Sequence, residues 1–229
     1  DLEDGGYLTR VPHGRRTLQR LRSSQVGAWH SEWMLDLRHR FPGITEGVHQ
    51  GWARFDGPAG TQVVDSAIEA TGAWQRSGNN ANSHGAFAAA QACDDLVDRL
   101  RDTMGRLLHA DPYGFVLGPS TTSNIFSITR AIGHDLRPDD EIICTRLDHD
   151  SNVSPWLLIG EDTGATVHLA PFDAGTGRLP VESITGLLNE RTRWVAVTGA
   201  SNAIGTMPDI TAITAAAHAA GARVVVDGV

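Results

Sequence analysis

Four polar segments of this chain each follow a short apolar run, and their residue types could bind a ligand or move a proton. The first, residues 118–124 (GPSTTSN), places small hydroxyl side chains where a helix is expected to begin. Free backbone N–H groups and the positive end of the helix dipole make such a position suitable for a phosphate group. Simple N-capping of the helix by Ser120 or Thr121 is the structural alternative.

The second segment, residues 148–156 (DHDSNVSPW), carries a histidine among short polar side chains. His149 could stack on an aromatic ligand or transfer a proton. The segment could equally be a helix start capped by Ser151 or Asn152. A metal site made of residues 148–150 is disfavoured, because three consecutive residues do not converge on one ion.

The third segment, residues 198–206 (TGASNAIGT), resembles the glycine-rich nucleotide loop of short-chain dehydrogenases, with Asp227 near the place of their ribose-binding acid. Ala203 replaces the middle glycine, and Pro208 places the next helix several residues too late to hold a pyrophosphate. About 190 residues also precede a motif that normally opens that fold. The dehydrogenase is therefore a remote alternative.

The fourth segment, residues 224–228 (VVVDG), is an apolar strand that ends in a carboxylate. A partly buried Asp227 needs a cationic partner to stay ionised. A protonated pyridine nitrogen is one such partner, and an arginine is the structural alternative.

Alternating helix and strand patterns connect these segments. Short apolar runs predict strands at 114–117, 141–145, 165–169, 193–198 and 223–227, and helical spacing predicts helices at 62–76, 86–109, 121–136, 153–162, 180–190 and 208–220. Such alternation indicates an α/β fold with a mostly parallel sheet. Ligands of these sheets bind at the carboxyl ends of the strands, where all four polar segments are expected.

Composition excludes several classes of function. All 19 basic residues are arginine, so a lysine-containing phosphate loop or a Schiff-base lysine cannot be complete within these 229 residues. A net charge of −8 disfavours nucleic-acid binding. No apolar run suggests a membrane span. Two distant cysteines, Cys93 and Cys144, indicate a reducing, cytoplasmic setting.

Taken in order, the segments resemble the cysteine desulfurase-like branch of class V aminotransferases, which are pyridoxal phosphate (PLP) enzymes of fold type I. The resemblance runs from about residue 37 to 229 and includes RFDGPAGTQ at 54–62, NNANSHG at 79–85 and TRLDHDSN at 145–152. It implies a three-layer α/β/α large domain, of which five strands are expected here. It also implies a helical segment with substrate loops at 34–110 and a partial PLP-binding domain at 111–229. Residues 1–33 show no clean periodicity and are expected to be an extension outside the fold, with a helical arm at 17–34 as the alternative.

The resemblance also implies a role for individual residues. Thr121 and Thr122 match the residues that hold the cofactor phosphate. His149 matches the histidine stacked on the pyridine ring, Asn202 the asparagine that bonds the ring hydroxyl, and Asp227 the acid paired with the ring nitrogen. His149 and Asp227 are thus the implied catalytic residues. The implied substrate-binding residues are Ala59, Asn82 and His84.

Two departures from the family pattern bear on the reaction. Asp150 stands where many desulfurases carry a second histidine, and the Schiff-base lysine, expected about two dozen residues after Asp227, is not in the chain. Neither Cys93 nor Cys144 fits the desulfurase nucleophile. We expect the front portion of a homodimeric PLP enzyme that acts on an amino acid, with L-cysteine as one candidate, and inactive as this chain alone. The alternative is a lysine-less pseudoenzyme, or half of a split assembly that a partner completes.

Overall fold

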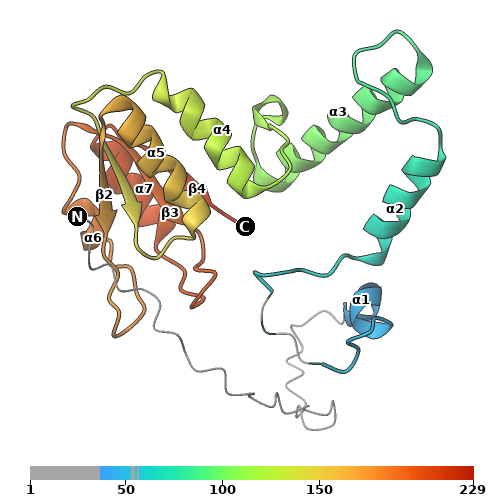
Figure 1. The fold of residues 1–229 in the computed structure, drawn as a ribbon, viewed down its shortest axis with the longest axis horizontal. Coiled ribbons are helices and arrows are strands. Elements are labelled where there is room, and N and C mark those ends of the chain that lie inside the picture. The colour runs from blue at the N-terminus through green and yellow to red at the C-terminus, as the bar shows by residue number, and fades with distance from the viewer. Residues whose placement is uncertain (1–36, 53–54, 56) are drawn as a thin grey trace, which may run out of the picture. The chain divides into compact units, whose positions relative to one another are not determined.

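The computed structural model describes residues 37–52, 55 and 57–229, which belong to two compact units, Asp1–Pro112 and Tyr113–Val229 (Figure 1). The expected extension at 1–33 lies outside the described residues. Each unit has its own internal contacts.

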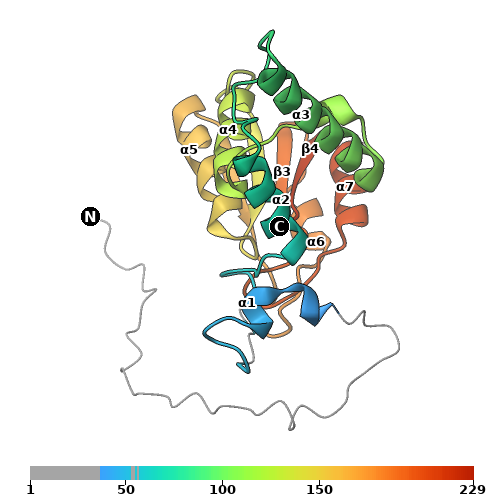
Figure 2. The same cartoon turned by 90° about the vertical axis from the view of Figure 1, so that its right-hand side faces the viewer.

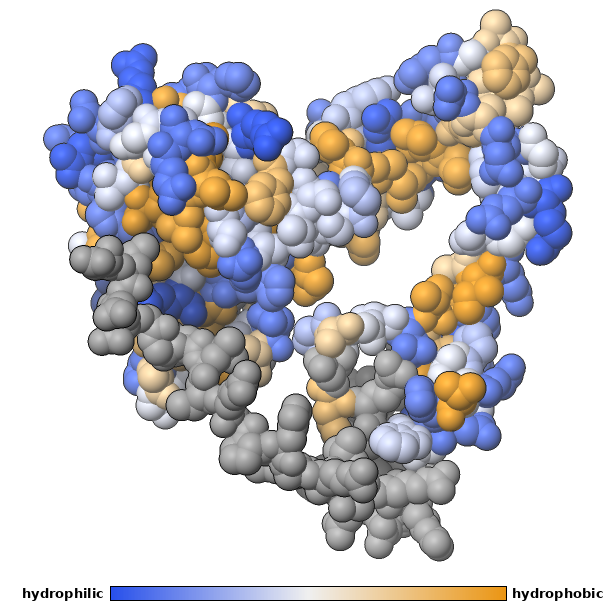
Figure 3. Space-filling view, viewed as in Figure 1, coloured by the Kyte–Doolittle hydropathy of each residue, from blue (hydrophilic) through white to orange (hydrophobic). Residues whose placement is uncertain are grey.

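Helices make up the regular structure of the first unit: η2 (Arg38–Arg40), α1 (Pro42–Thr45), α2 (Asp65–Arg76) and α3 (Ala88–Leu108). Arg40 binds the carboxylate of Asp65 through Nε and a terminal nitrogen at 2.7–2.9 Å, which ties the start of α2 to η2. Helix α3 carries an apolar stripe that includes the exposed Leu96, Leu100 and Leu107, visible along one side of the helix in Figure 3.

The second unit is built on a four-stranded, all-parallel sheet with the strand order β2-β1-β3-β4. Its elements, after the short turn η3 (Pro112–Gly114) that straddles the boundary, are α4 (Thr121–Gly133), β1 (Glu141–Thr145), η4 (Asp150–Asn152), α5 (Ser154–Thr163), β2 (Thr166–Ala170), α6 (Glu182–Thr185), β3 (Thr192–Thr198), α7 (Ile210–Ala219) and β4 (Arg223–Asp227).

Helices cover both faces of this sheet, which confirms the three-layer α/β/α prediction. Side chains alternate between the faces along each strand. Ile143 and Val197 pack with α6 and α7 in one core, whereas Cys144 and Ala196 pack with Trp156 of α5 in the other. Figure 2 shows α4 and α5 on one side of β3 and β4, with α7 on the other. The central strands β1 and β3 are buried along most of their length, which explains their apolar runs, whereas the edge strands β2 and β4 are only partly buried.

Two of the predicted elements are wrong. Residues 114–117 form no strand: Gly114 ends a 3-10 turn, and Val116 is 88 % exposed, so this short apolar run has no sheet neighbour to pair with. The helix predicted at 180–190 is only the single turn Glu182–Thr185, which ends at Gly186. Its remaining residues turn instead, because Asn189 donates to Glu141 and accepts from the Arg191 N–H.

Candidate functional site

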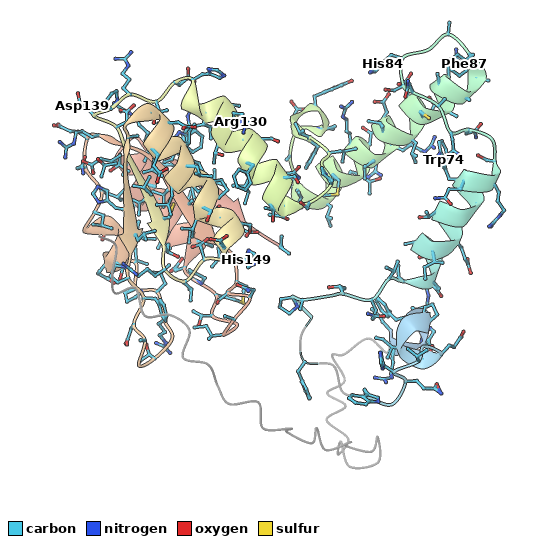
Figure 4. All side chains as sticks on the ribbon, in the orientation of Figure 1. Trp74, His84, Phe87, Arg130, Asp139 and His149 are labelled. Atoms are coloured by element: carbon cyan, nitrogen blue, oxygen red, sulfur yellow. The ribbon has the colours of Figure 1, made fainter. Side chains whose placement is uncertain are left out.

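The carboxyl ends of β1, β3 and β4 lie side by side at one edge of the sheet. Thr198, the last residue of β3, is in register with Asp227, the last residue of β4. Because the strands are parallel, the loops that follow them emerge together at this edge. Asp139, which precedes β1, and His149, which follows it, lie at opposite ends of the unit (Figure 4).

Asp227 is a buried carboxylate with few partners of its own. The residue is 8 % exposed, and its Oδ1 accepts one long hydrogen bond from the Val229 N–H at 3.3 Å. Among the described residues, no arginine or histidine lies within ion-pair distance of it, so the predicted arginine alternative finds no support there. A buried carboxylate of this kind has a strong electrostatic preference for a bound cation.

His149 sits on a turn that fixes one of its ring nitrogens. Nδ1 accepts the Ser151 N–H at 3.1 Å and lies 2.8 Å from Ser151 Oγ. A backbone N–H can only donate, so Nδ1 carries no proton in this arrangement and the neutral ring is protonated at Nε2. The residue is exposed, and its ring is therefore accessible to a ligand. The predicted cap by Ser151 or Asn152 is wrong: His149 itself caps η4, and Val153 precedes α5 without a side-chain cap.

Sequence reasoning missed Asp148 as a functional residue and considered it only as a metal ligand. Its carboxylate accepts from Thr145 Oγ1 and from Asn152 Nδ2 at 2.6 Å, and the backbone of Thr198 also favours its ionised form. Burial raises the pKa of Asp148 to about 6, and the nearby charge of Asp227 acts in the same direction, while these hydrogen bonds oppose the shift. An acid directly before a histidine, just after a buried strand, was the available sequence signal.

Asn202 lies on a closed loop between β3 and α7. Ser201 Oγ accepts the N–H groups of Ala203 at 3.3 Å and Ile204 at 3.4 Å, and the Ser201 N–H donates to the Thr206 carbonyl at 2.8 Å. Asn202 is exposed on this turn. Helix α7 begins only at Ile210, after the Asp209 cap. This late start removes the helix from the loop and argues against the dehydrogenase alternative.

The amino end of α4 carries the two threonines predicted to hold a phosphate. Ser120 Oγ accepts the Ser123 N–H at 3.1 Å, which confirms Ser120 as the N-cap. Thr121 and Thr122 are the first two helical residues, whose N–H groups have no acceptor within a helix. Helix α4 packs against η4, the turn that follows His149.

The three predicted substrate residues belong to the first unit and lie on exposed turns and loops. Ala59 and Asn82 are exposed. His84 is also exposed, has a left-handed φ of 65°, and is held by Asp94, which accepts its backbone N–H at 3.0 Å. Their role in a substrate pocket stays a prediction.

The cysteines do not resemble a nucleophile. Cys93 Sγ donates to the carbonyls of Asn79 and Ala81 at 3.2 Å, and burial in the sheet raises the pKa of the Cys144 thiol far above its ordinary value. Within residues 37–52, 55 and 57–229, no cluster of three or more potential ligands could hold a metal ion. No helix in the same part of the chain combines the length and the apolarity needed to cross a bilayer.

Comparisons with known proteins agree on one family. A family model described as Aminotransferase class-V matches residues 54–229. A cysteine desulfurase of Cronobacter sakazakii is 32 % identical over 195 residues, which cover 84 % of this chain and 48 % of that protein. The crystal structure of the Escherichia coli cysteine desulfurase CsdA superimposes with a TM-score of 0.70 at 29 % identity and covers 83 % of this chain and 47 % of that one.

A third match concerns the cofactor. A C-DES variant with glycine covalently linked to its PLP cofactor superimposes with a TM-score of 0.70 at 23 % identity, over 83 % of this chain and 49 % of that one. At this identity the likeness shows the fold alone. The chain spans about half the length of these relatives.

Proposed function

We propose, on the premise that this chain belongs to the aminotransferase class-V family, that its second unit forms the cofactor cradle of an enzyme acting on an amino acid. Members of this family use pyridoxal phosphate. The observation that carries the proposal for this chain is the buried Asp227, whose carboxylate has no basic partner among the described residues.

The residues at the carboxyl edge fit the chemical groups of this cofactor. Asp227 would pair with the pyridine nitrogen and keep it protonated, since a buried carboxylate stabilises a cation beside it. His149 would stack on the ring, and Asn202 would donate a hydrogen bond to the ring hydroxyl. Thr121 and Thr122 would hold the phosphate through hydroxyls and free N–H groups at the end of α4.

When bound, the cofactor supplies an electron sink for a substrate carbanion. The chain's own contribution is binding, orientation and proton transfer. Asp227 would accept a hydrogen bond from the protonated ring nitrogen. His149 would donate through Nε2–H, because its Nδ1 accepts the Ser151 N–H. Ala59, Asn82 and His84 would contact the substrate.

We propose L-cysteine as the first amino acid to test, because two of the matched proteins are cysteine desulfurases. The further expectations from the family resemblance are a homodimer and a cytoplasmic location. Release of alanine and sulfide from L-cysteine by the full-length protein would support desulfuration. If a different amino acid is consumed instead, the cofactor proposal stands and the desulfurase assignment is wrong.

One observation favours a second candidate function. Residues 1–229 contain no lysine, so a covalent anchor for the cofactor must come from other residues of the protein or from a partner chain. A protein without that lysine would be a pseudoenzyme or half of a split assembly. Reading the coding sequence beyond residue 229 for a lysine about two dozen positions after Asp227 distinguishes the two.

Cofactor binding is the direct test. Pyridoxal phosphate is titrated into the full-length protein and followed by its absorbance and by quenching of tryptophan fluorescence. Asp227→Asn should weaken binding and shift the absorbance of the bound cofactor. The matched control is Asp139→Asn, because Asp139 is exposed and lies at the opposite end of the sheet. Equal binding by wild type, Asp227→Asn and the control would refute the proposed role of Asp227.

A further inference from the structure

Asp148 connects three segments of the candidate site through one carboxylate. Thr145, at the end of β1, and Asn152, at the end of the turn that begins with His149, each donate a hydrogen bond to Asp148. The same turn contacts β3, and the backbone of Thr198 at the end of β3 favours the ionised form of Asp148. Thr145 and Asn152 are fully buried and Thr198 is 3 % exposed. Hydrogen bonds among buried groups are strongly directional constraints, because a lost partner leaves a desolvated polar atom.

The turn that carries His149 closes on the same carboxylate. Asn152 Nδ2 donates to Asp148 Oδ1 at 2.6 Å, while the Asn152 N–H donates to the His149 carbonyl at 2.9 Å. The His149 backbone is thus held between two bonds made by one buried asparagine. Loss of the first bond would leave the turn held only by the bond to the His149 carbonyl and by the Ser151 contacts of the ring.

The network continues into the core beneath the site. Asn152 Oδ1 accepts the indole N–H of Trp156 at 3.4 Å, and Trp156 is fully buried between the sheet and α5. Thr145 Oγ1 also accepts the Leu147 N–H at 3.1 Å, which orients its hydroxyl proton toward Asp148. The Trp156 indole therefore reports on the state of the network from a rigid position.

We infer that Asp148 is a positioning residue that holds the His149 turn in register with the carboxyl ends of β1 and β3. It sits close enough to Asp227 for the two carboxylates to interact electrostatically. Asp148 thus acts on the cofactor site through His149 and the strand ends. The predicted effect on cofactor affinity rests on the proposed function. The predicted effect on the conformation of the His149 turn rests on the hydrogen bonds alone.

The experiment compares four forms of the full-length protein: wild type, Asp148→Asn, Asp148→Glu and Asp150→Asn. Asp150 is the matched control, because it lies in the same turn but is exposed, and its carboxylate accepts from Ser154 Oγ at 2.6 Å and not from the network of Asp148. Nuclear magnetic resonance without cofactor records the His149 ring nitrogens and the Trp156 indole N–H. Pyridoxal phosphate binding is measured separately.

In Asp148→Asn, the His149 ring-nitrogen signals and the Trp156 indole signal should both shift. Cofactor affinity should fall about tenfold, which is the fold-change expected from a typical interaction free energy between contacting residues. Asp148→Glu keeps the charge and both oxygens, so it should restore the wild-type signals in large part. Asp150→Asn should match wild type throughout.

Unchanged His149 and Trp156 signals in Asp148→Asn would overturn the inference, and so would equal shifts in the Asp150→Asn control. Global unfolding of Asp148→Asn would be seen as collapse of all indole signals. In that case Asp148→Glu tests the inference: His149 and Trp156 signals like those of wild type support it, and signals unlike them overturn it. If the wild-type protein binds no pyridoxal phosphate, the proposed function fails while the cofactor-free signals still test the turn.

Discussion

Replacing Asp148 by asparagine should change how the free energy of unfolding depends on pH. Burial raises the pKa of this carboxyl from 3.8 to about 6 in the folded protein. Between these two values the unfolded chain releases the Asp148 proton while the folded protein keeps it. Ionisation therefore favours the unfolded chain, and the stability that Asp148 contributes in acid is lost as the pH rises through 6.

The magnitude follows from the two pKa values. A rise from 3.8 to about 6 corresponds to about 3 kcal/mol of unfolding free energy, of which about 2 kcal/mol is lost between pH 4.5 and pH 8. Asparagine does not titrate, so its variant lacks this loss. Hydrogen bonds that asparagine makes poorly lower its stability by an amount that does not depend on pH, and this offset cancels when two pH values are compared.

The assay is urea unfolding of both proteins across this range. From pH 4.5 to pH 8, the asparagine variant should gain about 2 kcal/mol relative to wild type, a relative change of about 1 M in the urea midpoint. The same comparison for Asp150→Asn should show no such trend, since that side chain is exposed. A pH-independent difference between wild type and Asp148→Asn would refute the assignment of Asp148 as a buried, destabilised carboxylate.

Three further predictions concern stability elsewhere in the second unit. Ser120→Ala removes the cap of α4 and should cost about 1 kcal/mol in chemical unfolding, whereas Ser127→Ala on the same helix should cost less. Trp156→Phe leaves Asn152 Oδ1 without its indole donor in a buried site and should cost about 2 kcal/mol; a loss near zero would mean that the 3.4 Å contact is no hydrogen bond. Hydrogen bonds from Asn189 and His168 and the charge of Arg191 hold the pKa of Glu141 below its ordinary value. Wild type should therefore be more stable than Glu141→Gln at neutral pH and should lose this extra stability as the pH falls through the lowered pKa. A stability difference that stays constant with pH would contradict this.

Local pattern predicted most of the second unit correctly. The strands at 141–145 and 223–227 coincide with β1 and β4, because a parallel strand that packs under helices forms a short apolar run that is visible in the sequence. The predicted strand at 114–117 has the same appearance over fewer residues but no neighbour to pair with. Strand pairing is a tertiary property, so no local pattern could separate the two cases.

Capping shows the same limit on a smaller scale. Ser120 was a predictable cap because its hydroxyl oxygen and the N–H group that donates to it are three residues apart at the start of one helix. At residues 149–152 the sequence contained four side chains able to cap. In the structure His149 caps the turn, and the Asn152 side chain bonds Asp148 instead.

The sequence by itself determined the family and its cofactor class, because the order of several polar loops after apolar strands can be recognised in the amino-acid sequence. It also determined that these 229 residues hold no lysine. Only the tertiary structure decided that Asp227 is buried without a basic partner among the described residues, that His149 accepts at Nδ1, and that Asp148 bonds the end of β1 to the His149 turn. Burial, tautomer and electrostatic coupling depend on which segments meet in space, and strands β1, β3 and β4 meet across about 80 residues of sequence.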